Sequence, residues 1–268
     1  MTGRAIVGVL AAAGVALCAG WVSAQPTGAM QPGGEAAVQP VEIDAAELPS
    51  AAEVFSSYIE AVGGEDAVRA VESRKFSGRV RIYQQGDPTP RQEGRIEMIA
   101  APPATLVQEI IFPGQASSAT YVKDGVVWQV DEQDRARQIT GETAARQITS
   151  AGFYQLADWE TMFESVEVVG GVEQGDRKAV RVRATHKDGR VEDYVFDLDS
   201  GLLLAVMGQR ASPVNPSQQV PFQRVYENYE ETDGVRYARR VLEQAGPIVF
   251  EIEVSSIETG IDVPEIEV

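Results

Sequence analysis

The stretch Glu192–Met207, EDYVFDLDSGLLLAVM, constrains the fold more than any other part of the chain. Its first half alternates apolar and polar residues with the period of two that is typical of a β-strand. Asp199-Ser200-Gly201 then supplies turn chemistry, because Asp bonds the backbone ahead of it and Gly takes a positive φ. The second arm, Leu202–Met207, has no polar residue, so we expect apolar material on both of its faces. One face would lie on the sheet core, and the other would need a helix, a loop or a ligand over it.

Alternation of this kind recurs through most of the chain after Lys75. Asp-Gly pairs such as Asp124-Gly125 and Asp233-Gly234 mark tight turns between the alternating segments. Strands that follow one another through short turns predict an antiparallel meander. An open sheet of that size curls, so we predict a mainly β (α+β) domain over Ser50–Val268, built as an open half-barrel of about 11 strands covered by a few helices.

Helical patterns interrupt the alternation at two places. Ser50 and Glu53 have the spacing of a capping box, and the amphipathic stripe that follows ends at Gly63-Gly64. Gly141–Glu164 is aromatic-rich and loses the β pattern, which predicts one or two helices inserted between two halves of the sheet. Further along, the polar and proline-containing stretch Ala211–Phe222 is expected to form a long loop.

The N-terminus has the pattern of an export signal followed by a tether. Met1–Ala24 has an early basic residue, an apolar run and a small-residue cleavage site, which favours a signal peptide over a membrane anchor. Lipidation at Cys18, which would make an outer-membrane lipoprotein, is not favoured because the larger Leu17 precedes it. Residues 25–49 are rich in Pro, Gly and Gln, so we expect a disordered linker and a periplasmic domain behind it.

Charge excludes one class of partner. The chain has 23 Lys and Arg against 40 Asp and Glu, and its formal net charge is −17. Nucleic acid is therefore not expected as a partner, because phosphate binding needs a basic surface. Adhesion of the surface to anionic membranes is disfavoured for the same reason.

Motifs for catalysis and for metal binding are scarce. The chain has one cysteine and one histidine, so we predict no metal site and no cofactor. His186 lies in a His-Lys-Asp-Gly stretch and is expected to be an exposed turn residue. No Gly-x-Ser-x-Gly elbow, Gly-x-Gly-x-x-Gly stretch or P-loop is present. Carboxylate pairs such as Glu251 and Glu253 are expected on solvated strand faces.

An excess of apolar residues is the remaining signal. Leu106–Phe112, Leu202–Met207 and Phe153–Phe163 are apolar on more than one side. Either helices cover the sheet in a thick core, or they enclose a cavity for an acyl chain or another hydrophobic ligand. From the alternation we predict that such a cavity is lined by Phe76, Val80, Ile96, Trp128, Tyr194, Phe196 and Leu204. The insert supplies three candidate lid residues, Phe153, Trp159 and Phe163.

Four motifs together resemble the outer-membrane lipoprotein-sorting superfamily, the Lol-type carriers and their relatives. They are the helix that ends at Gly63-Gly64, the Asp124-Gly125 hairpin with Trp128, and the hairpins within Tyr194–Leu203 and Tyr226–Val235. The resemblance spans roughly residues 51–268. It implies an open half-barrel whose apolar concave face is closed by helices and binds the acyl chains of lipids or lipoproteins in the periplasm.

The sequence thus predicts a non-enzymatic, monomeric envelope protein whose partners are a hydrophobic ligand or an acylated lipoprotein, and other envelope proteins. A role in lipid or lipoprotein trafficking to the outer membrane would follow. Ligand release would require the helical insert or the Ala211–Phe222 loop to move. Arg79 and Arg95, in early strands, are the candidates for the characteristic arginine of the carriers. Two alternatives stay open: an interaction or sensor module whose own helices fill the concave face, and an exported hydrolase that uses acidic residues.

Overall fold

The computed structural model describes residues 39–40, 48–115, 117–131, 133, 135–215 and 217–264. The predicted signal peptide with Cys18, and nearly all of the predicted linker, lie outside the described residues. In the part that is described, no helix is long and apolar enough to cross a membrane.

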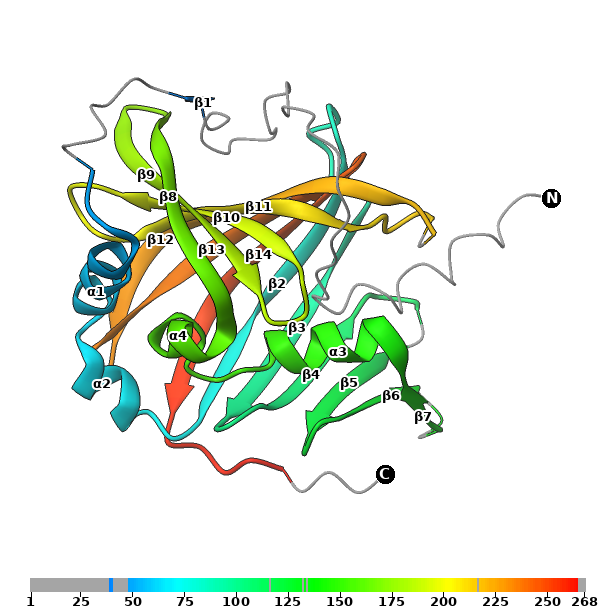
Figure 1. The fold of residues 1–268 in the computed structure, drawn as a ribbon. Coiled ribbons are helices and arrows are strands. Elements are labelled where there is room, and N and C mark those ends of the chain that lie inside the picture. The colour runs from blue at the N-terminus through cyan, green and yellow to red at the C-terminus, as the bar shows by residue number, and fades with distance from the viewer. Residues whose placement is uncertain are drawn as a thin grey trace.

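One curled antiparallel sheet dominates the fold (Figure 1). Its strands are β1 (Gln39–Pro40), β2 (Arg74–Gln84), β3 (Gln92–Ala101), β4 (Thr105–Ile111), β5 (Ser118–Lys123), β6 (Val126–Asp131), β7 (Ala136–Ile139), β8 (Phe163–Gln174), β9 (Arg177–His186), β10 (Val191–Asp197), β11 (Leu203–Ala211), β12 (Gln219–Thr232), β13 (Val235–Ala245) and β14 (Ile248–Thr259). They form two meanders, β2 to β7 and β8 to β14, which join where the last strand pairs with β2. Among the described strands, β1 and β7 are the two edges and do not pair with each other, so the sheet is open. The predicted fold class is confirmed, with 14 strands among the described residues in place of about eleven.

The strand β11 is buried on both faces, as its apolar sequence predicts. Leu203 and Val206 pack in one cluster beneath the first helix, whereas Leu204 packs in a second cluster with Val195 and Val225. A bulge in β10 between Val195 and Phe196 shifts the register beside it. The burial of both faces explains why no polar residue occurs in the first five positions of this strand.

The loop predicted at Ala211–Phe222 is present but shorter than expected. Strand β11 extends to Ala211 and β12 begins at Gln219, so the connection spans only residues 212–218. The start of β12 was missed because polar residues and prolines dominate this stretch. Val220 and Phe222 nevertheless alternate with the period of a strand, and both are buried in the core beneath the helices.

Helix α1 (Ala51–Ala61) begins at the predicted capping box. The Ser50 Oγ accepts from the Glu53 backbone N–H, and the Glu53 carboxylate accepts from the Ser50 N–H at 2.8 Å. The helix buries Phe55 on the concave face, in the cluster with Phe196 and Tyr194. A shorter helix, α2 (Glu65–Ala70), follows.

The predicted helical insert joins the two halves of the sheet. It consists of α3 (Gly141–Ser150), a 3-10 turn η3 (Gln155–Asp158) and α4 (Trp159–Met162). Helix α3 covers β4, β5 and β6 through Ala144 and Ile148. The Trp159 ring stacks on Phe55 of α1, with ring centroids 4.9 Å apart. The insert therefore covers one half of the concave face and contacts the helix that covers the other.

Candidate ligand-binding site

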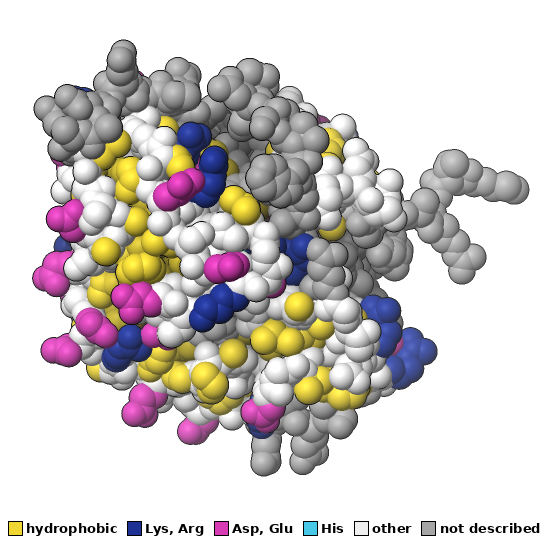
Figure 2. All heavy atoms as spheres, in the orientation of Figure 1, with side chains coloured by type: hydrophobic (Ala, Val, Ile, Leu, Met, Phe, Trp, Pro, Cys, Tyr) yellow, Lys and Arg dark blue, Asp and Glu magenta, His cyan; other side chains and the backbone are white. Residues whose placement is uncertain are grey.

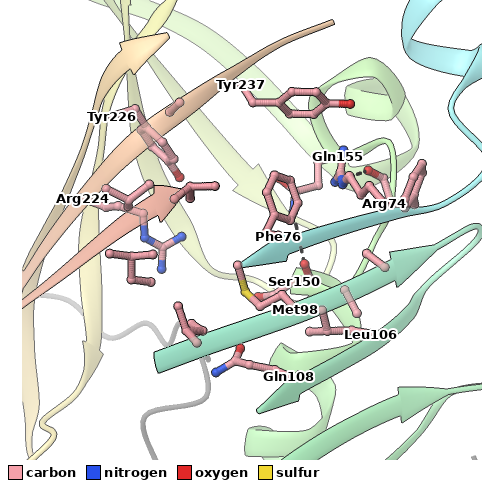
Figure 3. Close-up of a pocket in the computed structure, with 18 of the residues that line it drawn as sticks. Arg74, Phe76, Met98, Leu106, Gln108, Ser150, Gln155, Arg224, Tyr226 and Tyr237 are labelled. Atoms are coloured by element: carbon pink, nitrogen blue, oxygen red, sulfur yellow. Dashed lines mark hydrogen bonds between the residues drawn. The ribbon is translucent and has the colours of Figure 1, made fainter. Parts of the chain in front are cut away.

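A cavity of about 420 Å³ lies on the concave face, between the sheet and the helices. Strands β2, β3, β4, β12, β13 and β14 form its floor, while α1, α2 and the insert cover it. Most of the side chains that face it are apolar, among them Phe76, Met98 and Leu106 (Figure 3). Val241, Phe250 and Ile252 also line it. This volume and lining are typical of pockets for small hydrophobic ligands.

Outside the cavity, the face that carries the helices shows patches of hydrophobic side chains, with acidic side chains along its left and lower edges and Lys and Arg side chains at its lower right (Figure 2). The helices thus cover the concave face without sealing it behind a continuous polar layer.

Arg74, the first residue of β2, lies at one end of the cavity. Its Cζ atom lies 4.4 Å from the ring centroid of Phe153, 5.5 Å from that of Phe76 and 5.9 Å from that of Tyr237. Its Nη2 donates a hydrogen bond of 3.0 Å to the Phe153 backbone oxygen. Burial lowers the pKa of Arg74 from its ordinary value, since the surroundings are mainly aromatic. Cation–π contacts replace part of the lost hydration, so this arginine connects the sheet to the insert.

A second group of charges lies elsewhere on the cavity wall and consists of Arg210, Arg224 and Glu243, on β11, β12 and β13. One carboxylate oxygen of Glu243 accepts from Arg210, and the other accepts from the Nε of Arg224 at 2.7 Å and from its Nη2. Arg210 is only 4% exposed and Glu243 only 7%. Burial, with the nearby positive charge of Arg224 as a second cause, lowers the pKa of Arg210 to about 10.

Strand register separates the two charged ends. Arg224 pairs with Glu243, Glu243 pairs with Phe250, and Phe250 pairs with Ile82 of β2. Arg74 lies eight residues before Ile82 on the same strand, a separation of roughly 26 Å at about 3.3 Å per residue. The cavity therefore runs along the strands, with cationic side chains toward both ends.

The residues predicted from alternation divide between this cavity and other parts of the fold. Phe76, Val80 and Ile96 line the cavity, and so does the lid candidate Phe153. Tyr194 and Phe196 lie on the concave face but are packed beneath α1, with Trp159 and Phe163 in the same cluster. Whether any of these side chains touches a ligand remains a prediction.

Leu204 and Trp128 do not line the cavity. Leu204 packs in the cluster on the opposite face of β11. Trp128 follows Val127, whose side chain packs beneath α3, so the tryptophan points to the other face of β6. Alternation identifies the two faces of a strand, but it does not say which one is concave.

Sequence reasoning missed the charged residues of the cavity, Arg74, Arg210, Arg224 and Glu243. The sequence did carry one signal for these residues, namely their position in the alternation of each strand. Arg224, for example, lies two residues after Phe222 and two before Tyr226, so all three share the concave face of β12. A charged residue that alternates with core residues is placed on the buried face of its strand. Because burying a charge is costly, such a residue indicates an internal polar site more specifically than an apolar residue does.

The expectation that His186 is an exposed turn residue is wrong. It is 3% exposed, at the end of β9, where the Phe163 ring packs edge-on against it at 4.8 Å. Its Nε2 lies 3.0 Å from the Glu192 carboxylate, which also accepts from the Tyr194 hydroxyl at 3.0 Å. Burial raises the pKa of Glu192, but hydrogen bonding to His186 and the charges of His186 and Arg190 outweigh it and lower that pKa overall. The cluster lies under Phe163 and outside the cavity lining.

Glu251 is also not on a solvated face, contrary to expectation. It is buried on β14, where it accepts from the Tyr83 hydroxyl at 2.6 Å and from the Arg240 Nε at 2.7 Å. Arg81 completes its hydrogen bonding at 3.3 Å. Glu251 is thus a structural carboxylate whose charge is neutralised by neighbouring strands. Within the described residues, no group of His, Asp and Glu side chains is arranged to hold a metal ion.

Arg79 and Arg95 lie on the outer face of the sheet. Arg79 is mostly exposed and forms long ion pairs with Glu93 at 3.7 Å and Glu253 at 3.8 Å. Arg95 is exposed. Neither lines the cavity, so within the described residues the arginine of β2 that reaches the concave face is Arg74.

No protein-family model matches this chain, and no curated protein matches it. Several solved structures are similar to it, among them the two that follow. A LolA superfamily protein from Nitrosomonas europaea is 12% identical, with a TM-score of 0.56 over 81% of this chain and 96% of that one. A DUF1329 family protein from Desulfovibrio piger is 10% identical, with a TM-score of 0.53 over 80% of this chain and 94% of that one. Such low identity establishes the fold alone, and the chain therefore has the open half-barrel fold of the Lol-type carriers.

Proposed function

We propose that this chain is an exported, periplasmic, non-enzymatic protein that binds the hydrocarbon chain of a lipid or of an acylated lipoprotein. The observation that carries the proposal is the cavity of about 420 Å³ between the sheet and the helices. Its floor is lined by Phe76, Met98 and Ile252, and the charged groups of Arg74 and Arg224 lie toward its two ends. The shared fold with a LolA superfamily protein supports the same reading.

Hydrophobic transfer supplies the driving force. Each methylene moved from water into such a lining contributes about 0.8 kcal/mol. Ten buried methylenes would contribute about 8 kcal/mol before the loss of rotational and translational freedom is subtracted. The cavity therefore needs no specific polar contact to hold a chain of moderate length.

The insert is the proposed lid. Phe153 lines the cavity and its backbone oxygen accepts a hydrogen bond from Arg74, so the insert contacts the sheet at the cavity wall. Movement of residues 150–157 would open that end without disturbing the strand ladder. The Phe55–Trp159 stack holds the other end of the insert against α1.

The test is binding of an uncharged fluorescent probe, N-phenyl-1-naphthylamine, and its displacement by long-chain alcohols and fatty acids. Met98 lines the cavity, so Met98→Trp should fill part of it and weaken probe binding severalfold or more. Arg95 is exposed on the same strand and lies on the opposite face, so Arg95→Trp is the matched control and should leave binding unchanged. Absence of probe binding in the unmodified chain would contradict the proposal and favour an interaction module whose own helices fill the half-barrel.

A further inference from the structure

The charge of the cavity is opposite in sign to the charge of the chain. The whole chain has a formal net charge of −17. Among the described residues that line the cavity, four are arginines (Arg74, Arg210, Arg224 and Arg236) and one, Glu243, is a carboxylate. Arg236 is exposed, so the internal excess rests on the other three arginines. A cavity that served only hydrocarbon would not need this excess of buried cations, which are costly to remove from water.

The group formed by Arg210, Arg224 and Glu243 is unbalanced by one positive charge. One carboxylate serves two guanidinium groups, one at each of its oxygens. The Nε of Arg210 is buried and has no hydrogen-bond partner among the described residues. Figure 3 shows the Arg224 guanidinium directed into the cavity, beside Tyr226. A buried donor without a partner, next to an uncompensated positive charge, is a feature that an anionic ligand would satisfy.

Arg74 lies in the same cavity and its Nε likewise has no hydrogen-bond partner among the described residues, but it is a single cation and is less suited to hold an anion. Its guanidinium is surrounded by the rings of Phe76, Phe153 and Tyr237, and one of its N–H groups is committed to the Phe153 backbone. Arg210 and Arg224 instead place two guanidinium groups around one carboxylate, a geometry that suits planar or tetrahedral oxyanions.

Hydrocarbon can continue directly from this charged group. Phe250 is the strand neighbour of Glu243, and Ile252 and Val80 follow toward Phe76 on the same concave face. We propose that the cavity selects amphiphiles whose head group is an anion, a carboxylate or a phosphate, held by Arg210 and Arg224 with the chain lying along β14 and β2. The inference rests on the proposed function and names the class of its ligand.

The head group is tested with three amphiphiles of equal chain length on the full chain without its signal peptide at pH 8: laurate, dodecanol and dodecylamine. Each amphiphile is titrated, at concentrations below those at which it aggregates, against the chain with the uncharged naphthylamine probe bound, and displacement of the probe gives its affinity. Laurate is expected to bind about tenfold more tightly than dodecanol, as one charge-assisted contact allows, and dodecylamine most weakly. Acetate alone should not displace the probe, because it has no chain to bury. Equal affinities for all three would overturn the inference and leave the proposed function intact, whereas no displacement by any would contradict both.

Two substitutions separate ligand recognition from structural support. Arg224→Gln and Glu243→Gln both remove the same ion pair, so both should lower stability. Their effects on laurate should be opposite: Arg224→Gln should reduce its affinity toward that of dodecanol, and Glu243→Gln should increase it severalfold. Arg81→Gln removes a comparable ion pair on the outer face, with Glu251, and should leave the preference unchanged. A fall in laurate affinity in both cavity variants would mean that the group is structural only. If these variants fail to fold, the three-amphiphile comparison on the unmodified chain decides the question alone.

The two sources of such a head group are distinguished by adding dodecyl phosphate. Tighter binding of dodecyl phosphate than of laurate would assign the site to phospholipid-like ligands. The reverse order would assign it to free fatty acids. Either order supports selection of an anionic amphiphile, provided that dodecanol binds more weakly than both.

Discussion

Arg74 contacts Phe153 in two ways: its Nη2 donates a hydrogen bond of 3.0 Å to the Phe153 backbone oxygen, and its Cζ lies 4.4 Å from the ring centroid of the same residue. The first residue belongs to β2 and the second to the insert, so this pair joins the floor of the cavity to its cover. A side chain that contacts both backbone and ring holds a segment more firmly than either contact alone.

Replacing Arg74 with Leu should loosen the insert. Loss of the hydrogen bond and the cation–π contacts removes about 1 to 2 kcal/mol of local stability. Amide hydrogen exchange of residues 150–157 should become about tenfold faster, and probe exchange should accelerate with it. Arg79→Leu, an exposed change on the same strand, is the control. Unchanged exchange in the Arg74 variant would show that the insert is held by other contacts.

Replacing Phe55 with Ala should destabilise the domain by about 3 to 5 kcal/mol. The ring is fully buried, stacked on Trp159 and edge-on to Phe196 at 5.5 Å, so its removal leaves a void between α1 and the sheet. Urea denaturation followed by tryptophan fluorescence measures the change in the free energy of unfolding. Ser56→Ala, at the next and exposed position of the helix, should change it by less than about 0.5 kcal/mol. A loss below about 1 kcal/mol for Phe55→Ala would contradict this packing.

Replacing Gly201 with Ala should destabilise the turn before β11. Gly201 has φ +73°, and an added Cβ would lie 2.8 Å from the Ser57 backbone oxygen of α1. Gly86 provides a matched control, because it has φ +83° with no atom within 4 Å of an added Cβ. Gly86→Ala should lower the free energy of unfolding by about 1 kcal/mol through backbone strain alone, and Gly201→Ala should lower it by clearly more. Equal losses at both sites would mean that α1 moves away from the turn without penalty.

Acid should weaken the cluster around Glu192. The folded-state pKa of this carboxyl is lowered from its ordinary value of 4.5, so its contribution to stability is present above that value and is lost as the pH falls through the folded pKa. Glu192→Gln should therefore reduce the free energy of unfolding at pH 7, with a difference from the unmodified chain that narrows below about pH 4. Thermal denaturation between pH 3 and pH 7 measures both curves. A difference that stays constant over this range would mean that the charge of Glu192 does not stabilise the fold.

The strands and turns were predictable from the sequence because their signals are local. Period-two alternation and Asp-Gly turns fix where a strand begins and ends, and Asp124 and Asp233 indeed take positive φ before their glycines. The pairing of β14 with β2 is not local, since it joins residues about 170 positions apart, for example Arg81 and Glu251. The number of strands predicted that the sheet curls, but no feature of the sequence predicted that β14 pairs with β2.

The site was harder to predict than the fold, for a physical reason. Alternation assigned Phe76 and Leu204 the same role, although one faces the cavity and the other faces away from it. Which part of the concave face is filled depends on where α1 lies, and that is decided by the packing of Phe55 on Phe196. The burial of His186 was not predictable because its partners are distant in sequence or on another strand: Glu192 belongs to β10, and Phe163 is the first residue of β8.

The most direct test of ligand binding is the native mass of the chain without its predicted signal peptide, residues 25–268, expressed in a Gram-negative periplasm and purified without detergent. We expect an added mass that matches a fatty acid or a phospholipid, present in the unmodified chain and in Arg95→Trp but reduced in Met98→Trp. A bare mass in all three proteins, together with no binding of the naphthylamine probe, would contradict the claim that the concave face holds an accessible hydrophobic site.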